Sequence, residues 1–167
     1  MFTRLYLKTI LIVLGIAYLP SLTLANTSPA KNLAQMSIFD KMHQQEVIDI
    51  TIKTDLEKLD VDRKLDEYQP ANLKMDLGKS ELKFDIKVKA RGKYRNRICD
   101  FPPIKLKFKK DDLTQNGFST FNKLKLVTHC MDDKQIGREL IMREFLTYEL
   151  YREMTENSYR VQLAKVT

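Results

Sequence analysis

The sequence predicts an α+β fold, in which a twisted antiparallel sheet packs against one main helix. Several segments of five to ten residues alternate apolar and charged side chains, which is the pattern of strands with one buried face. One longer segment, residues 136–154, instead carries apolar side chains at helical spacing. The length of 167 residues suits one domain, or a piece of one.

Residues 1–25 are expected to be a secretory signal peptide. They combine a basic start, an apolar run over residues 9–19 and a small-residue ending, which predicts cleavage between Ala25 and Asn26. A membrane anchor is the alternative, but the apolar run is shorter than the roughly 18 residues that a spanning helix needs. We therefore expect export to the periplasm or the extracellular space, with no stable membrane span after cleavage.

The mature chain is expected to hold a linker, residues 26–45, and one domain, residues 46–167. Removal of the signal peptide takes away Arg4 and Lys8 but no acidic residue, so the formal net charge of +7 becomes +5. This modest positive charge favours anionic partners without identifying them.

The first half of the domain holds two predicted strands. "EVIDITIKTD", residues 46–55, has isoleucine at every second position and predicts a strand. Residues 56–78 are polar and acidic and contain Pro70 and Gly78, so connections and a short helix are expected there. "ELKFDIKVKARG", residues 81–92, is the clearest strand, because apolar and charged side chains alternate along it.

The next two strands, residues 104–108 and 123–127, are expected to pair antiparallel. Both alternate apolar residues with lysines. If Ile104 lies opposite Leu126 or its neighbour, the numbers of paired residues sum to about 230. This arithmetic fixes which side chains of the two strands share a face.

A helix and a last strand complete the predicted elements. Asp132, followed by Gln135 three positions later, fits a capping box at the start of the helix over residues 136–154. Residues 159–167 have the alternation of a further strand.

The two cysteines are expected to form a disulfide. The same register places Cys99 opposite Cys130 or its neighbour, within reach of a bond. An exported protein meets an oxidising compartment, and a loop of about thirty residues would be closed, which stabilises by about 3 kcal/mol. A free or metal-binding pair is the alternative, but His43 and His129 are isolated and no further ligands gather, so no metal site is predicted.

The basic residues form the sharpest pattern. Residues 86–110 contain ten cations and only Asp100 as an anion, and the lysines fall on one face of each strand. Like charges opposite each other cost stability, so water and salt, the acidic residues 55–67 or a bound phosphate should compensate. A solvated face and an anion site both remain open. Nucleotide-loop and catalytic motifs are not found, and nucleic acid is disfavoured as a partner because few aromatic residues interleave the cations.

Three segments in order resemble the amino-terminal part of the CotH family of secreted or surface-located atypical protein kinases. They are "VKARGKYRNRICDFPPIKLKF", "NKLKLVTHCMDDKQIGRELIMREFLTYELYREM" and "YRVQLAKVT", and the resemblance covers residues 46–167. The chain departs from the family at Lys93 and Tyr94, where serines are usual, and in its cysteine pair.

The resemblance implies a kinase-like amino-terminal lobe. In such a lobe a strand lysine, Lys105 or Lys107, would position ATP phosphates, and a helix glutamate, Glu144 or Glu139, would orient that lysine. The candidate nucleotide or phosphate contacts are Arg91, Lys93, Lys105, Lys107, Arg138 and Glu144. The family's catalytic and metal-binding aspartates lie beyond the last strand of this chain. ATP and a divalent metal are therefore expected only for a full-length kinase, and this chain is expected to be inactive by itself.

Two functions follow as hypotheses. The chain is either a fragment of an exported, ATP-dependent kinase that phosphorylates protein, or a non-catalytic envelope binding module. In the second case its basic sheet face would bind an anionic envelope polymer or a partner protein.

Overall fold

A computed structural model describes residues 35–78 and 80–167, so the expected signal peptide lies outside the described residues. The first half of the described chain forms α1 (Ile38–Met42), β1 (Val47–Lys53), α2 (Leu56–Val61), the 3-10 helix η1 (Asp62–Lys64), β2 (Gln69–Asp76) and β3 (Glu81–Ala90). The second half forms α3 (Arg95–Ile98), β4 (Ile104–Phe108), α4 (Lys110–Gln115), β5 (Lys123–Leu126), α5 (Lys134–Met154) and β6 (Leu163–Val166). The fold is α+β.

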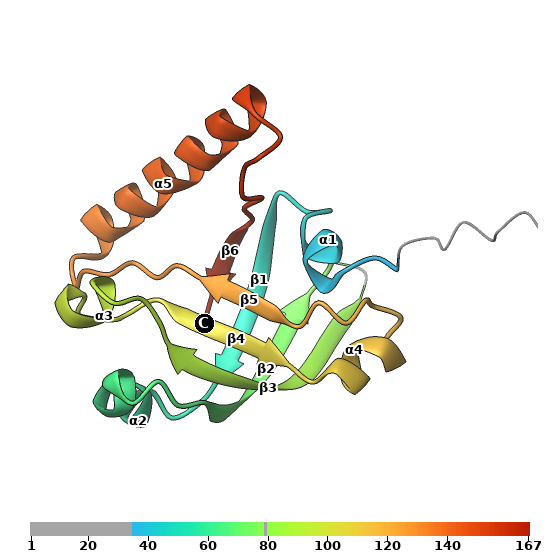
Figure 1. Ribbon diagram of the computed structural model, residues 1–167, viewed down its shortest axis with the longest axis horizontal. Coiled ribbons are helices and arrows are strands. Elements are labelled where there is room, and N and C mark those ends of the chain that lie inside the picture. The colour runs from blue at the N-terminus through green and yellow to red at the C-terminus, as the bar shows by residue number, and fades with distance from the viewer. Residues whose placement is uncertain (1–34, 79) are drawn as a thin grey trace, which may run out of the picture. The chain divides into compact units, whose positions relative to one another are not determined.

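The strands form one curled sheet of six strands in the order β5-β4-β3-β2-β1-β6 (Figure 1). All neighbours pair antiparallel except β1 and β6, which are parallel. The sheet is therefore mixed, where the sequence predicted an antiparallel one. The reason lies in the long connection through α5, which returns the chain to the far edge of the sheet in the same direction as β1.

Strict alternation places one face of the sheet in the hydrophobic core. Along β2 the burial alternates at every residue, and β3 and β4 repeat the pattern. Short elements close the core: Ile38 of α1, Leu59 of α2 and Leu113 of α4 are 0%, 3% and 0% exposed. The core is thus filled by the sheet and by the short helices.

The predicted register of β4 and β5 is confirmed. Ile104 pairs with Leu126, and Lys105 and Lys107 lie directly opposite Lys125 and Lys123. The numbers of each pair sum to 230, as the sequence arithmetic requires.

β2 is a strand that the sequence analysis missed. Pro70 was interpreted as a breaker, yet it is the second residue of β2 and pairs with Lys87 of β3. On its other side β1 begins to pair only at Asn72, so the missing N–H of Pro70 costs no bond to β1. The alternation of Ala71, Leu73 and Met75 was the available signal.

α1 lies in the stretch that was expected to be a linker. Ser37 caps this helix, its hydroxyl accepting from the Asp40 backbone N–H while the Asp40 carboxylate accepts from the Ser37 N–H. Ile38 and Met42 then enter the core. The folded unit thus begins before residue 46.

α5 differs most from expectation. It begins after Asp133, whose carboxylate accepts from the backbone N–H groups of Gln135 and Ile136, so Asp133 and not Asp132 is the cap. Gly137 is its only buried residue, and the expected packing of this helix on the sheet is wrong. The short helices already fill the core, and Figure 1 shows α5 to one side of the sheet. Within the described ranges, no helix is both long and apolar enough to cross a bilayer.

Candidate anion-binding face

Six lysines form a regular array on the face of the sheet opposite the core, and we call this array the lysine face. Its members are Lys87 and Lys89 of β3, Lys105 and Lys107 of β4, and Lys123 and Lys125 of β5. The register aligns them in two rows of three across the strands. Strand geometry separates the Cα atoms by about 4.8 Å within a row and about 6.7 Å between rows.

Each row sets like charges directly opposite one another. Lys107 of the central strand faces Lys87 on one side and Lys123 on the other. Such cross-strand pairs are destabilising unless a partner offsets the repulsion. The face therefore needs either counter-charge or solvent screening.

Tyr68 supplies part of the compensation. The ammonium groups of Lys89 and Lys107 lie 4.8 and 5.3 Å from the centre of its ring. An aromatic face attracts cations through its quadrupole, so one ring holds two lysines of different rows. Tyr68 was not predicted from the sequence, although its position two residues before Pro70 puts it in phase with the outward side chains of β2.

Asp66 supplies the only carboxylate that pairs with this face in the described part of the chain. It lies 2.5 Å from the Lys89 ammonium, and its backbone oxygen also accepts from that lysine. The other five members of the lysine face make no ion pair with the described residues, and residues 1–34 and 79 contain no Asp or Glu. The expected contribution of the acidic residues 55–67 is confirmed, but for one lysine only.

Arg91 and Lys93 continue the basic surface beyond the end of β3. Arg91 keeps the phase of Lys89, and its backbone N–H donates to the Pro103 carbonyl at 2.8 Å. Gly92 then turns the chain with a φ of 91°, a left-handed conformation that favours glycine, so Lys93 lies in the exposed turn before α3. These two residues extend the basic surface past β3.

The candidates on α5 lie differently from what the resemblance implied. Glu144 accepts a hydrogen bond of 2.8 Å from the Arg95 guanidinium, and this ion pair links α5 to α3. Glu139 pairs with Arg143 on the same helix, and Arg138 is exposed. Lys105 and Lys107 are adjacent on β4, but no glutamate of α5 pairs with either in the described structure.

The predicted disulfide joins Cys99 to Cys130 and holds one end of the lysine face. It links the segment before β4 to the segment after β5. The Arg63 guanidinium adds a second tie, because it donates to the carbonyl oxygens of Cys99 and Asn96 at 2.9 and 3.4 Å. The strand ends that carry Lys105 and Lys125 are thereby fixed relative to each other.

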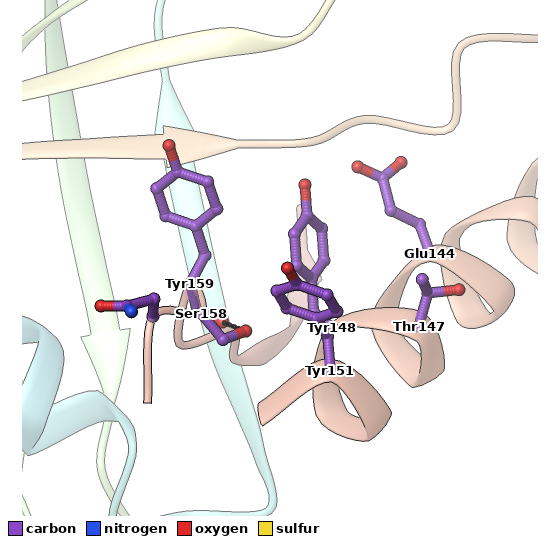
Figure 2. A pocket seen from close by; sticks show the side chains of 7 residues that line it. Glu144, Thr147, Tyr148, Tyr151, Ser158 and Tyr159 are labelled. Atoms are coloured by element: carbon purple, nitrogen blue, oxygen red, sulfur yellow. Dashed lines mark hydrogen bonds between the residues drawn. The ribbon is translucent and has the colours of Figure 1, made fainter. Parts of the chain in front are cut away.

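A tyrosine-lined pocket of about 420 Å³ adjoins the lysine face. Figure 2 shows Tyr148 and Tyr151 on α5 beside Tyr159 of the following segment. The Tyr148 and Tyr159 rings meet edge to face, with centres 6.1 Å apart. The Lys125 ammonium lies 5.3 Å from the centre of the Tyr159 ring, so the pocket and the lysine face share a boundary.

The chemistry available is anion binding. Ammonium groups donate charge-assisted hydrogen bonds to phosphate or carboxylate oxygens. A metal centre finds no support in residues 35–78 and 80–167, where no group of three His, Cys, Asp or Glu side chains gathers. The described site thus consists of cations and aromatic rings.

Comparison of the chain with protein-family models, with curated proteins and with solved structures gives no match. The resemblance to the CotH family therefore stays a prediction.

Proposed function

We propose that the chain is an exported, non-catalytic binding module whose lysine face docks an anionic polymer of the cell envelope. The array of six lysines, of which only Lys89 has a carboxylate partner among the described residues, is the observation that carries this proposal. An anion lying across a row would offset the repulsion between the opposed lysines. Export rests on the expected signal peptide of residues 1–25.

A repeating polymer fits this face better than a single small anion. One exposed ammonium contributes little to binding, because water and salt screen it. Two rows about 6.7 Å apart, each with three cations, can instead meet several anions of one chain at once. Linked contacts raise the overall affinity above that of any single contact.

The test uses inorganic polyphosphate chains as the probe. We expect the Lys105→Ala/Lys107→Ala variant to bind the probe at least about tenfold more weakly than the wild type, because removing each charge-assisted hydrogen bond to phosphate costs about 1 kcal/mol. Fluorescence anisotropy with labelled polyphosphate measures the dissociation constants, and circular dichroism checks that the variant folds.

The matched control is Lys58→Ala/Lys134→Ala. It removes the same charge from two exposed lysines outside the lysine face. Polyphosphate affinity should change less than about twofold in this control, since only long-range attraction is reduced. An equal loss of affinity in both double variants would mean that only the net charge of the protein matters. It would refute the lysine face as a specific binding surface.

A kinase-like nucleotide lobe is the second candidate. It is favoured by one observation: Glu144 of α5 accepts a hydrogen bond from Arg95 of α3, so a helix glutamate orients a cation. A nucleotide site should bind ATP with Mg²⁺ more tightly than inorganic tripolyphosphate, because the base adds contacts. A polymer-binding face should bind both with similar affinity. Isothermal titration calorimetry separates the two cases. Equal affinities for ATP with Mg²⁺ and for tripolyphosphate would contradict the nucleotide proposal.

A further inference from the structure

α5 carries ten apolar side chains, and the described residues leave seven of them exposed. Its exposed apolar residues are Ile136, Leu140, Met142, Leu146, Leu150, Tyr151 and Met154. Apolar side chains that gather along a helix normally face a core or a binding partner. The described residues leave this helix without enough contact to account for its composition.

The two sides of α5 differ in their surroundings. Ile141, Phe145 and Tyr148 are partly buried, so this inner side faces the rest of the protein. On the opposite side Leu140, Leu150 and Met154 are 45%, 66% and 82% exposed. Most of the uncovered apolar surface therefore lies on the side of the helix that faces away from the rest of the protein.

The uncovered side follows the spacing of a coiled-coil seam, and we call it the outer stripe. Its members are Ile136, Leu140, Arg143, Thr147, Leu150 and Met154, and all six are exposed. Successive members are separated by four, three, four, three and four residues. This alternation of three and four keeps a stripe facing one partner helix along its whole length.

The positions of the outer stripe, and its apolar members, are symmetric about residue 145. Reversal of the helix exchanges Ile136 with Met154 and Leu140 with Leu150, each an apolar pair. A surface that complements itself on reversal is what a two-fold symmetric contact between identical chains requires. The symmetry therefore points to a second copy as the occupant.

The polar middle of the stripe selects the antiparallel direction. In a parallel pair Arg143 would meet Arg143 of the other copy in one layer. In an antiparallel pair it meets Thr147, which is uncharged. Arg143 is already paired with Glu139 of its own helix at 2.5 Å, and its aliphatic stem can cover apolar neighbours.

We propose that α5 pairs antiparallel with α5 of a second copy, with Leu140 of each chain against Leu150 of the other. Leu146 and Tyr151 flank the stripe and widen the apolar contact. The contact from residue 136 to 154 is about 27 Å long, at 1.5 Å per residue. Such a contact lies at the small end of stable interfaces, so a dissociation constant in the micromolar range is expected.

Analytical ultracentrifugation of the purified protein from about 1 to 200 μM, a range that spans micromolar affinities, tests the pairing. The wild type should change from monomer to dimer over this range. Leu140→Glu and Leu150→Glu should each weaken the dimer at least about tenfold, because each buries a charge in the seam. Met142→Glu is the control, since Met142 is an exposed apolar residue of α5 outside the stripe, and it should leave the dissociation constant within about threefold.

Several results would overturn the proposal. They are a monomer at every concentration, open-ended oligomers in place of a dimer, or an equal effect of the Met142 control. Helical content from circular dichroism shows whether a variant has simply lost α5. Cysteine cross-linking remains decisive even if the charged variants fail to fold.

Cysteine cross-linking tests the direction without adding a charge. Leu140→Cys and Leu150→Cys are prepared separately, with the native Cys99–Cys130 disulfide kept oxidised. Mixed together they should form a covalent dimer much faster than either does alone, because position 140 faces position 150. Fast self-linking of the Leu140→Cys protein would indicate a parallel pair, and no linking in the mixture would remove the contact altogether.

Discussion

The central strands and α5 use similar apolar side chains but reach opposite degrees of burial. Leu106 in β4 is 3% exposed, whereas Leu146 in α5 is 53% exposed. The strand residue finds its partners within the folded unit, because the sheet curls over α1, α2 and α4. The helix residue does not. Hydrophobicity alone therefore does not decide burial; a surface must also find a complementary partner.

This difference separates two kinds of exposed surface. The lysine face lies on the side of the sheet opposite the core, and five of its six lysines have no carboxylate partner among the described residues, so their charges are available to a ligand. The outer stripe of α5 is the reverse case, since its apolar residues lack a core and gain stability only from association.

The largest expected effect is in the sheet. Leu106→Ala should lower the free energy of unfolding by about 2–5 kcal/mol, because it leaves a cavity in the core. The same truncation in α5, Leu146→Ala, should cost less than about 1 kcal/mol at protein concentrations where the chain is a monomer. Urea denaturation followed by circular dichroism measures both. Similar losses of stability would mean that α5 is buried in the folded monomer.

Gly137 tests the packing at the start of α5, where it is the one fully buried residue of this helix. A β carbon there would lie 2.8 Å from the His129 carbonyl oxygen, which is too close for a stable contact. Gly137→Ala should therefore destabilise by about 1–2 kcal/mol, although alanine alone would favour the helix by about 1 kcal/mol. Thermal unfolding gives the sign, and a rise in stability would show that the start of α5 is free of His129.

The smallest expected effect on stability is at Asp40. Its carboxylate pairs with Arg160 and so links α1 to the segment after α5. Hydrogen bonds from Ser37 and then Arg160 lower the pKa of the Asp40 carboxyl from 3.8 to about 2. The folded state thus favours the ionised form. Its contribution is fully present above the unfolded pKa and is lost as the pH falls through about 2.

Asp40→Asn should therefore lower stability by about 0.5–1 kcal/mol at neutral pH, the range of partly exposed charged pairs. The difference from the wild type should shrink between pH 4 and pH 2, where the wild-type carboxyl becomes protonated. Urea unfolding at several pH values measures it. A difference that stays constant down to pH 2 would mean that the charge of Asp40 is not involved.

Much of the sheet could be predicted from the sequence because its signals are local. The alternation in β3 and β4 shows which side chains are buried. The register of β4 and β5, in which the numbers of paired residues sum to 230, follows from aligning the two short strands. The disulfide follows from the same register. β2 was not predicted because a proline usually interrupts a strand. Pro70 is tolerated here because β1 does not pair with β2 at that position, and this is known only from the structure.

The candidate site was predictable only in part. The lysines of each strand are evident from spacing, but their alignment in rows depends on which strands are neighbours. Tyr68 could not be assigned to the site without β2, and the Glu144–Arg95 pair depends on where α5 lies in space. Tertiary placement, which no local pattern encodes, decided these interactions.

The salt dependence of polyphosphate binding tests the lysine face most directly. We predict that the logarithm of the affinity falls linearly with the logarithm of the salt concentration, because each neutralised phosphate releases a counterion. In Lys105→Ala/Lys107→Ala the slope should be smaller by about 1–2, since two ammonium groups no longer neutralise phosphates, and in Lys58→Ala/Lys134→Ala it should be unchanged. A slope that is the same in the wild type and in Lys105→Ala/Lys107→Ala would contradict the proposal that these lysines bind the polymer.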